Sequence, residues 1–406
     1  MKLISRERYL DFLRRHRDRD IIKVVSGIRR CGKSTLFTLF KKELQASGVK
    51  DNQIISINFE DLRFEHLQKY HAMHDYIVGR LQPNVMNYIF LDEIQHVAQF
   101  ERAVGSLFAM ENTDIYITGS NAYFMASDIA TLLTGRYVQI EMLPLSFKEF
   151  YESKFSHKPL TLKPIYELYL RDSSFPYTQR LEGNAFDIQE YLQGLYSTLL
   201  LNDIVARLKV SDVTILQDII RYMMDNIGSL LSPTKIANTL TSMGRKIDNK
   251  TVDRYIRGIE DSLLMYRVDR FDVRGKSIFK TNAKFYGVDM TLRNQLVGVQ
   301  GRDTGHILEN MVYLELRRRG YTVFVGQLAK GEIDFVAQKP GGILEYYQVS
   351  ETVLDPNTRD RELAPLEAVK DQYPKYLLTM DEIYSPHNFD GIKQYNVLSW
   401  MLGEYD

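Results

Sequence analysis

A loop near the N-terminus has the residue types and spacing that bind phosphate groups. Residues 26–40 read SGIRRCGKSTLFTLF and contain the pattern Gly-x-x-x-x-Gly-Lys-Ser, with its glycines at Gly27 and Gly32. The β-branched apolar run IIKVV precedes the loop, and a segment with helical apolar spacing follows it. Strand, glycine-bounded loop and helix, in this order, form the context in which the pattern indicates a triphosphate site.

The charge of a triphosphate explains why these residue types are needed. Backbone N–H groups at a helix N-terminus supply fixed partial positive charge, and glycine lets the backbone approach because it carries no Cβ. We expect Lys33 to reach the β- and γ-phosphates and the hydroxyl group of Ser34 to bind Mg²⁺. The other loop residues expected to contact the nucleotide are Gly27, Arg29, Arg30, Cys31, Gly32 and Thr35.

Two adjacent carboxylates, Asp92 and Glu93, end the apolar run NYIFLDE. The run is typical of a strand buried on both faces, and ligands bind at the carboxyl ends of strands in open α/β sheets. We expect Asp92 to hold Mg²⁺, mostly through water, and Glu93 to polarise the attacking water. A simple polar end to the strand is the alternative, and the phosphate loop favours the catalytic interpretation.

Two further polar residues follow later apolar runs. Asn121, after DIYITGS, is placed to orient the water near the γ-phosphate, although Gly-Ser-Asn is also turn chemistry. Arg136 begins the run RYVQIEM. It would either reach the nucleotide of a neighbouring subunit, an effect typically worth ~10³–10⁵ in rate, or form a surface ion pair. The sequence leaves both alternatives open.

Cys31, the single cysteine of the chain, lies inside the phosphate loop. A thiol beside a helix N-terminus, a lysine and two arginines is expected to have a lowered pKa. The alternative is that the cysteine only fills a small position. A single cysteine also excludes an intrachain disulfide, which is typical of a reducing compartment.

The elements that must position these residues follow from the pattern of apolar runs. Five such runs alternate with helical segments and predict an α/β fold with a doubly wound parallel sheet. The runs are 21–25, 54–60, 87–93, 114–120 and 136–142.

Length and charge bound the remaining interpretation. The 406 residues suggest two to three domains. Lys+Arg and Asp+Glu number 52 each, which excludes a strongly basic nucleic-acid binder by bulk charge but not a local basic face. There is no signal-peptide pattern and no apolar run of the ~18 residues that a membrane span needs. We therefore expect a cytoplasmic protein with no membrane partner.

The residues after 225 indicate two helices and two strands. Ser232 is a suitable N-cap and Pro233 a suitable first residue of one helix. A second helix over 248–262 places Lys250, Arg254 and Arg257 on one face. These three side chains would contact DNA, form a solvated face or dock another domain, and the sequence does not choose among these roles.

The motifs GIRRCGKST, IFLDEIQ, ITGSNA and LTGRYVQIEMLPLSFKEF, in this order, resemble the ATPase domain of a large family of prokaryotic AAA-type proteins. The resemblance assigns Walker A, Walker B and sensor roles to Lys33, Ser34, Asp92, Glu93 and Asn121, and a less secure finger role to Arg136. Members of this family join the ATPase to a winged helix and to a domain similar to restriction endonucleases. Such ATPases commonly form rings or filaments, so the resemblance implies a homo-oligomer.

The C-terminal region is similar to the PD-(D/E)xK nucleases, with one departure. In those enzymes carboxylates hold Mg²⁺ and a lysine positions water. The resemblance places Glu309 and Asp334 at the first two positions, but the third motif reads Gln348-Val349-Ser350 instead of Glu-x-Lys. The acidic residue could be replaced by Glu332 or Glu345, and the lysine by Lys330 or Lys339. We expect a degenerate restriction-endonuclease-like domain whose nuclease activity is lost.

These patterns divide the chain into four expected parts and three functional hypotheses. The parts are an AAA-type P-loop ATPase domain (1–150), a helical linker region (151–225), a winged helix (226–290) and a degenerate restriction-endonuclease-like domain (291–406). The leading hypothesis is an ATPase that uses ATP and Mg²⁺ and couples the nucleotide state to assembly or to a DNA- or protein-contacting C-terminal half. The alternatives are an ATP-gated nuclease and a nucleotide-dependent adaptor with negligible turnover.

Overall fold

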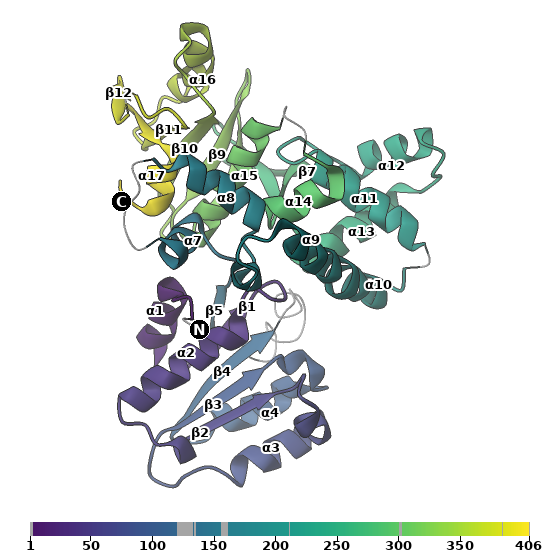
Figure 1. Cartoon of the computed structure of the whole chain (residues 1–406), viewed down its shortest axis with the longest axis vertical. Helices are drawn as coiled ribbons and strands as arrows, with labels where there is room; N and C mark the ends of the chain where they lie inside the picture. The colour runs from purple at the N-terminus through teal and green to yellow at the C-terminus, as the bar shows by residue number, and fades with distance from the viewer. Residues whose placement is uncertain are drawn as a thin grey trace. The chain divides into compact units, whose positions relative to one another are not determined.

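Two compact units make up the chain in the computed structural model (Figure 1). The residues described are 3–119, 133, 135–155, 161–210, 212–299, 303–383 and 385–405. The first unit is Met1–Pro144 with Asp261–Leu263, and the second is Leu145–Glu260 with Leu264–Asp406. Each unit is described by itself.

The first unit contains a parallel sheet, which confirms the predicted doubly wound α/β fold. Within its described residues five strands are ordered β2-β3-β4-β1-β5 (Figure 1). Each expected run forms one strand: β1 (Ile22–Ser26), β2 (Ile54–Asn58), β3 (Asn87–Asp92), β4 (Thr113–Gly119) and β5 (Tyr137–Glu141).

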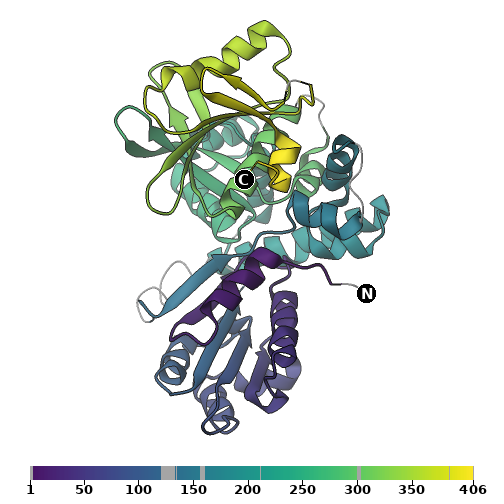
Figure 2. The ribbon, with the colours of Figure 1, turned by 90° about the vertical axis from the view of Figure 1, so that its left-hand side faces the viewer.

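Helices cover both faces of this sheet because its side chains alternate between the faces. The helices are α1 (Glu7–His16), α2 (Lys33–Ala46), α3 (Tyr70–Val78) and α4 (Phe100–Phe108), with short turns η1 (Asp51–Gln53), η2 (Leu62–Leu67) and η3 (Ile94–His96). On one face, Phe37 of α2 packs edge-on against Phe90 of β3, which stacks on Tyr116 of β4. On the other face, Ile89 and Ile115 pack into a core with α3 and α4. Figure 2 shows the unit turned by 90°.

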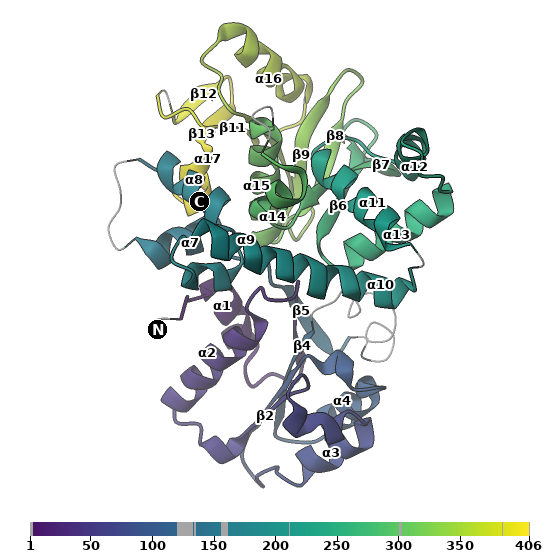
Figure 3. The ribbon, with the colours of Figure 1, turned by 45° about the vertical axis from the view of Figure 1, so that its right-hand side comes forward.

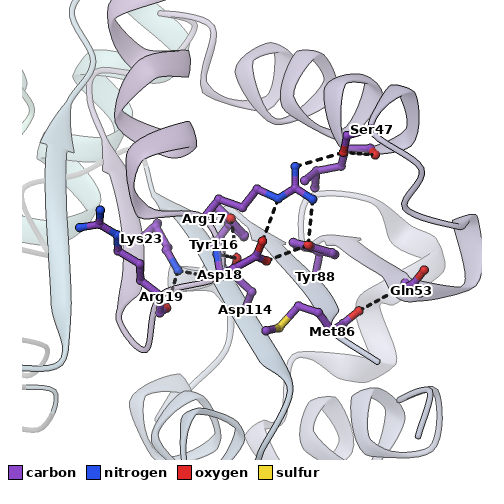
Figure 4. A network of polar contacts seen from close by, with 11 residues as sticks. Arg17, Asp18, Arg19, Lys23, Ser47, Gln53, Met86, Tyr88, Asp114 and Tyr116 are labelled. Atoms are coloured by element: carbon purple, nitrogen blue, oxygen red, sulfur yellow. Dashed lines mark hydrogen bonds and ion pairs between the residues drawn. The ribbon is translucent and has the colours of Figure 1, made fainter. Parts of the chain in front are cut away.

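A buried polar network lies at the amino-terminal ends of the strands of this sheet (Figure 4). Lys23, near the start of β1, forms an ion pair with Asp114, near the start of β4, and both side chains are fully buried. Tyr116 donates a hydrogen bond to Asp114 at 2.7 Å, and Tyr88 donates to Asp18 at 2.7 Å. The network therefore fixes the register of β1 and β4 at the strand ends opposite the phosphate loop.

The second unit begins with helices, as expected for residues 151–225. They are α7 (Phe147–Lys154), α8 (Lys163–Asp172), η4 (Pro176–Arg180), α9 (Ala185–Gly194), the π-helix η5 (Leu195–Leu201), α10 (Asn202–Leu208) and α11 (Val213–Asp225). The segment before η4 is tied to a later helix, because the carboxylate of Asp289 accepts hydrogen bonds from the backbone and the hydroxyl group of Ser174. Asp289 is the N-cap of α14 (Met290–Val297).

Two helices and a hairpin follow α11. They are α12 (Pro233–Ser242), α13 (Asn249–Asp261), β6 (Met265–Asp272) and β7 (Ser277–Gly287). The expected N-cap is confirmed, because Ser232 accepts a hydrogen bond from the backbone of Lys235 and Pro233 opens α12. Leu231, just before α12, pairs with Ala283 of β7.

The hairpin is the edge of a larger mixed sheet. Within the described part of this unit, eight strands are ordered β12-β13-β11-β10-β9-β8-β6-β7. The strands not yet given are β8 (Thr322–Gln327), β9 (Glu332–Gln338), β10 (Leu344–Ser350), β11 (Lys375–Thr379), β12 (His387–Phe389) and β13 (Ile392–Asn396). The sheet is therefore continuous across the boundary expected at residue 290.

Helices lie on both faces of this sheet (Figure 3). They are α15 (Thr304–Arg318), α16 (Pro356–Ala368) and α17 (Val397–Leu402). Tyr313 of α15 contacts the ring of Phe335 in β9, whereas Leu366 of α16 belongs to the core that includes Val336. Adjacent residues of one strand point to opposite faces, so α15 and α16 cover opposite sides.

Of the helices formed by the described residues, none combines the length and apolar character needed to cross a bilayer.

Candidate functional site

The phosphate loop joins β1 to α2. Its glycines are required because the backbone there adopts positive φ angles and, at Gly27, packs closely against another backbone segment. Gly27 has φ +150°, and a Cβ built on it would lie 2.2 Å from the carbonyl oxygen of Met142. Gly32 has φ +108° at the N-cap of α2. A side chain at either position would displace the backbone, which would move the N–H groups of the loop.

Lys33 is held over the loop and beside Glu93. Its side chain is 3% exposed, and Nζ donates to the carbonyl oxygens of Gly27 at 3.1 Å and Ile28 at 3.3 Å. The same Nζ lies 3.5 Å from Oε1 of Glu93. The ammonium group is therefore placed between the loop and the carboxylates, as a phosphate-binding cation must be.

Asp92 and Thr118 lie side by side at the carboxyl ends of β3 and β4. The hydroxyl group of Thr118 donates a hydrogen bond to Oδ1 of Asp92. The backbone N–H of Glu93 donates to the same hydroxyl oxygen at 2.9 Å. Asp92 also has a side-chain hydrogen bond with Ser34 at the start of α2. One hydroxyl group thus orients both carboxylate residues.

The sequence analysis did not identify Thr118. A signal was present, because Thr118 is two residues after Tyr116 and so points to the α2 face, as Asp92 does two residues after Phe90. The register of β3 and β4, which places the two side chains next to each other, became visible only in the sheet.

The surroundings of Asp92 and Glu93 are consistent with a built polar site. Burial raises the pKa of Asp92, and the hydrogen bonds from Thr118 and Ser34 oppose this rise. Glu93 has φ +54°, a left-handed conformation that is uncommon for a residue with a side chain. Gln95 donates a hydrogen bond to Oε2 of Glu93 at 2.5 Å, which fixes the carboxylate further.

The other expected loop residues differ in exposure. Arg29 is partly buried, and its Nη1 lies 3.7 Å from Oε1 of Glu60. Arg30 is exposed and has φ +66°. Ser34 is exposed and Thr35 is partly exposed at the start of α2.

The predicted lowering of the Cys31 pKa is wrong. Cys31 is fully buried, and burial raises its pKa despite the charges of Lys33 and Arg6. Its Sγ would lie 3.1 Å from a Cβ placed on Gly27. The thiol fills a tight position under the loop, which agrees with the alternative interpretation.

Arg136 and Asn121 are the two remaining predicted site residues of the first unit. Arg136 is exposed at the start of β5, with its guanidinium 5.9 Å from the ring centroid of Phe108. β5 runs parallel to β1, and the phosphate loop follows the carboxyl end of β1. Arg136, which immediately precedes β5, therefore lies near the opposite, amino-terminal ends of these strands. Its role toward a neighbouring subunit stays a prediction. Asn121 lies outside the described residues.

A second polar cluster lies in the other unit, around Glu309 of α15. Oε1 of Glu309 accepts a hydrogen bond from Tyr286 and lies 3.0 Å from Nζ of Lys284. Nζ of Lys284 is also 2.7 Å from Glu332. Lys284 lowers the pKa of Glu309, although burial acts in the opposite direction.

Asp334 and Gln348 border this cluster. Asp334 accepts a hydrogen bond from the backbone of Val349 at 2.8 Å, and burial and the charge of Glu309 raise its pKa. Gln348 donates a hydrogen bond to Glu362 at 2.9 Å. Ser350 donates to the backbone of Thr352. Gln348 and Ser350, which stand where a nuclease would have Glu and Lys, therefore bind the Glu362 carboxylate of α16 and a backbone carbonyl group.

The cation of this cluster comes from an unexpected position. Lys339 forms an ion pair with Glu345 at 2.7 Å, so its ammonium group is engaged there. Lys284, on β7, contacts the carboxylates instead. Lys284 precedes Glu309 by 25 residues and lies in the segment expected to form the winged helix. Only the folded structure brings its ammonium group to α15.

The basic residues of α13 are exposed. Lys250, Arg254 and Arg257 all face solvent, which agrees with their expected common face. Arg257 is paired with Asp253 at 2.7 Å, and the guanidinium of Arg254 lies 5.4 Å from the ring centroid of Tyr255.

Comparison with known proteins agrees with the geometry of the first unit. Residues 19–151 match an AAA domain, and residues 164–303 match a domain of unknown function (DUF8612). The first unit is thus a P-loop domain of the AAA type. The chain is 38% identical over 402 residues to an uncharacterized protein of Haemophilus influenzae, with 98% of this chain and 99% of that protein covered. The chain belongs to the family of that protein.

Two other similarities are more distant. An uncharacterized protein of Methanocaldococcus jannaschii is 29% identical over 370 residues, covering 86% of this chain and 79% of that protein. Among solved structures, a Walker-type ATPase of Pyrococcus abyssi has a TM-score of 0.48 and 15% identity, covering 72% of this chain and 96% of that chain.

Proposed function

We propose that this protein is an ATPase that binds ATP with Mg²⁺ and hydrolyses it at the phosphate loop of the first unit. The observation that carries the proposal is the convergence of Lys33, Asp92 and Glu93, oriented by Thr118. The match of residues 19–151 to an AAA domain supports it.

Each residue has a role that its contacts support. Lys33 exchanges the carbonyl oxygens of the loop for phosphate oxygens, and the loop N–H groups bind the remaining phosphate charge. Ser34 and Asp92 supply the oxygen ligands that Mg²⁺ prefers, and the ion would neutralise charge on the phosphates. Glu93, fixed by its backbone bond to Thr118, accepts a proton from the attacking water.

Turnover of ATP by the purified chain tests this proposal. Lys33→Ala should abolish ATP binding, whereas Glu93→Gln should retain binding and lose turnover by roughly 10²-fold or more. Lys42→Ala, at an exposed lysine later in α2, serves as the control for loss of a positive charge. Turnover that survives Glu93→Gln would exclude hydrolysis at this site. Binding without turnover in the unmodified chain would favour a nucleotide-dependent adaptor.

We also propose that residues 226–290 form a winged helix. The support is the order of elements that follow α11: the short pairing of Leu231 with Ala283, α12, α13 and the β6–β7 hairpin. A winged helix commonly contacts DNA, and Lys250, Arg254 and Arg257 are exposed on α13. DNA binding that weakens in Lys250→Ala and Arg254→Ala, with a smaller salt dependence, would support this partner. Unchanged binding would assign these residues to a solvated face.

For the C-terminal sheet we propose a degenerate restriction-endonuclease-like domain without nuclease activity. The support is the ammonium group of Lys284, which pairs with Glu309 and Glu332 where a nuclease would hold a cation. The nuclease alternative predicts metal-dependent DNA cleavage that disappears in Glu309→Ala and Asp334→Ala. We expect no cleavage with Mg²⁺ or Mn²⁺ in either the unmodified chain or these variants. Cleavage that depends on Asp334 would establish the alternative.

Assembly is the remaining part of the proposal. We propose a homo-oligomer in which Arg136 reaches the nucleotide of a neighbouring copy, and its exposure at the start of β5 supports this. Arg136→Ala should then lower turnover by at least ~10³-fold without weakening ATP binding. An unchanged rate, or a monomer in the presence of ATP, would exclude this role.

A further inference from the structure

A buried arginine at the start of α1 contacts the phosphate loop from behind. Arg6 is only 3% exposed. Its Nη1 donates a hydrogen bond to the carbonyl oxygen of Cys31 at 3.0 Å. Its Nη2 donates to the carbonyl oxygens of Leu143 at 2.6 Å and Pro144 at 3.4 Å. One guanidinium group therefore joins the loop to the segment that ends the first unit.

The segment 142–144 runs directly against the loop. The backbone N–H of Met142 donates to the carbonyl oxygen of Ser26 at 2.7 Å. The same residue's carbonyl oxygen occupies the space that a Cβ on Gly27 would need. Any shift of the loop backbone must therefore be accommodated by 142–144.

A second side chain of α1 holds the same segment. The hydroxyl oxygen of Tyr9 accepts a hydrogen bond from the backbone N–H of Leu143 at 3.1 Å. The guanidinium group of Arg6 lies 4.8 Å from the Tyr9 ring centroid. Arg6 and Tyr9 thus bind the two backbone polar groups of Leu143 from one helix.

We infer that Arg6 is a positioning residue that sets the phosphate loop and transmits its state to residues 142–144, where the chain leaves the ATPase unit. This inference rests on the proposed function, because the loop must respond to nucleotide. A planar guanidinium donates in fixed directions, so it links two carbonyl groups more rigidly than a lysine would. Leu145, the next residue, already belongs to the second unit.

Arg6 contacts a different side of the loop from the one that binds nucleotide. Arg6 binds the carbonyl side of the loop, whereas phosphates bind its N–H side. Loss of the guanidinium leaves the buried carbonyl oxygens of Cys31 and Leu143 without this donor, which favours a rearranged loop. The cost therefore falls on nucleotide binding and on 142–144, and not on the chemistry at Glu93.

Hydrogen exchange and equilibrium binding of MgATP to the full chain test this inference. The variants are Arg6→Ala, Arg6→Lys and, as the matched control, Arg15→Ala at an exposed arginine on the same helix. Without nucleotide, Arg6→Ala should speed amide exchange in both 27–32 and 142–145. It should also weaken MgATP binding by about tenfold, as expected for buried carbonyl groups left unpaired. Nucleotide-dependent protection of 142–145 should be lost.

The controls keep this outcome distinct from a general loss of stability or function. Arg6→Lys should restore part of the binding, and Arg15→Ala should match the unmodified chain in every measurement. Exchange that is unchanged at 142–145 in nucleotide-free Arg6→Ala would overturn the inference, whether or not the protein binds ATP. Failure of the unmodified chain to bind MgATP would instead overturn the proposed function.

Discussion

The hydroxyl group of Thr118 donates a hydrogen bond to the carboxylate of Asp92 across two adjacent parallel strands. The same hydroxyl oxygen accepts a hydrogen bond from the backbone of Glu93. A residue at the end of β4 thereby orients both acidic residues at the end of β3, next to the lysine of the phosphate loop.

Replacement of Thr118 tests this orientation. Thr118→Val keeps the volume but removes both hydrogen bonds, so Glu93 loses the bond that holds its left-handed backbone. We expect kcat to fall by ~10-fold or more, with a smaller change in KM, because losing a buried hydrogen bond costs about 1–3 kcal/mol. Thr118→Ser keeps the hydroxyl group and is the control. Equal loss in both variants would assign the effect to packing.

The buried Asp92 carboxylate should lower the stability of the folded chain at neutral pH, although turnover requires it. Its raised pKa means that the folded chain holds this proton more tightly than the unfolded chain does. The contribution is therefore favourable at low pH and is lost as pH rises through the ordinary and then the raised pKa. Asp92→Asn should raise the free energy of unfolding at neutral pH while abolishing Mg²⁺-dependent turnover. A less stable variant in urea unfolding at pH 7 would contradict this prediction.

Turnover should also respond to acid. Mg²⁺ binds the ionised carboxylate, so protons compete with the metal ion from a higher pH than at an exposed aspartate. The hydrogen bond from Thr118 lowers the pKa of Asp92, and Thr118→Val should move the acidic limb of the kcat/KM profile to higher pH. An acidic limb at the same pH in both proteins would show that Asp92 does not govern it.

The thiol of Cys31 should react slowly in the folded chain. Full burial removes access, and the raised pKa leaves less of the reactive thiolate. A thiol-specific disulfide reagent should label the protein at least ~10²-fold faster in denaturant than in buffer, because only the open state reacts. Comparable rates in the two conditions would contradict the buried position.

Removal of the Lys284 ammonium group should destabilise the second unit. Lys284→Met removes the ammonium group beside the buried Glu309 and leaves His306 as its remaining basic neighbour, a change that costs about 3–5 kcal/mol. The lowered pKa of Glu309 contributes stability above its ordinary pKa of 4.5, and this contribution is lost as pH falls through the lowered pKa. The destabilisation in urea should therefore be larger at pH 7 than at pH 4. Lys250→Met, at an exposed lysine, should change stability little.

Local patterns in the sequence determined the phosphate loop, the Asp92–Glu93 pair and the five strands of the first sheet. These features depend on residues close together in the chain: glycine spacing, strand-length apolar runs and polar residues at strand ends. For the same reason the N-cap at Ser232 and the position of α13 were predictable from the sequence.

The tertiary structure decided the contacts that depend on distant parts of the chain. Thr118 meets Asp92 through strand register, Arg6 meets the carbonyl of Cys31 through the packing of α1, and Lys284 meets Glu309 through the packing of α15 against β7. Burial also reversed the expected pKa shift of Cys31, because removing water outweighed the nearby positive charges. Burial and long-range pairing are properties of the whole fold, and local residue patterns do not encode them.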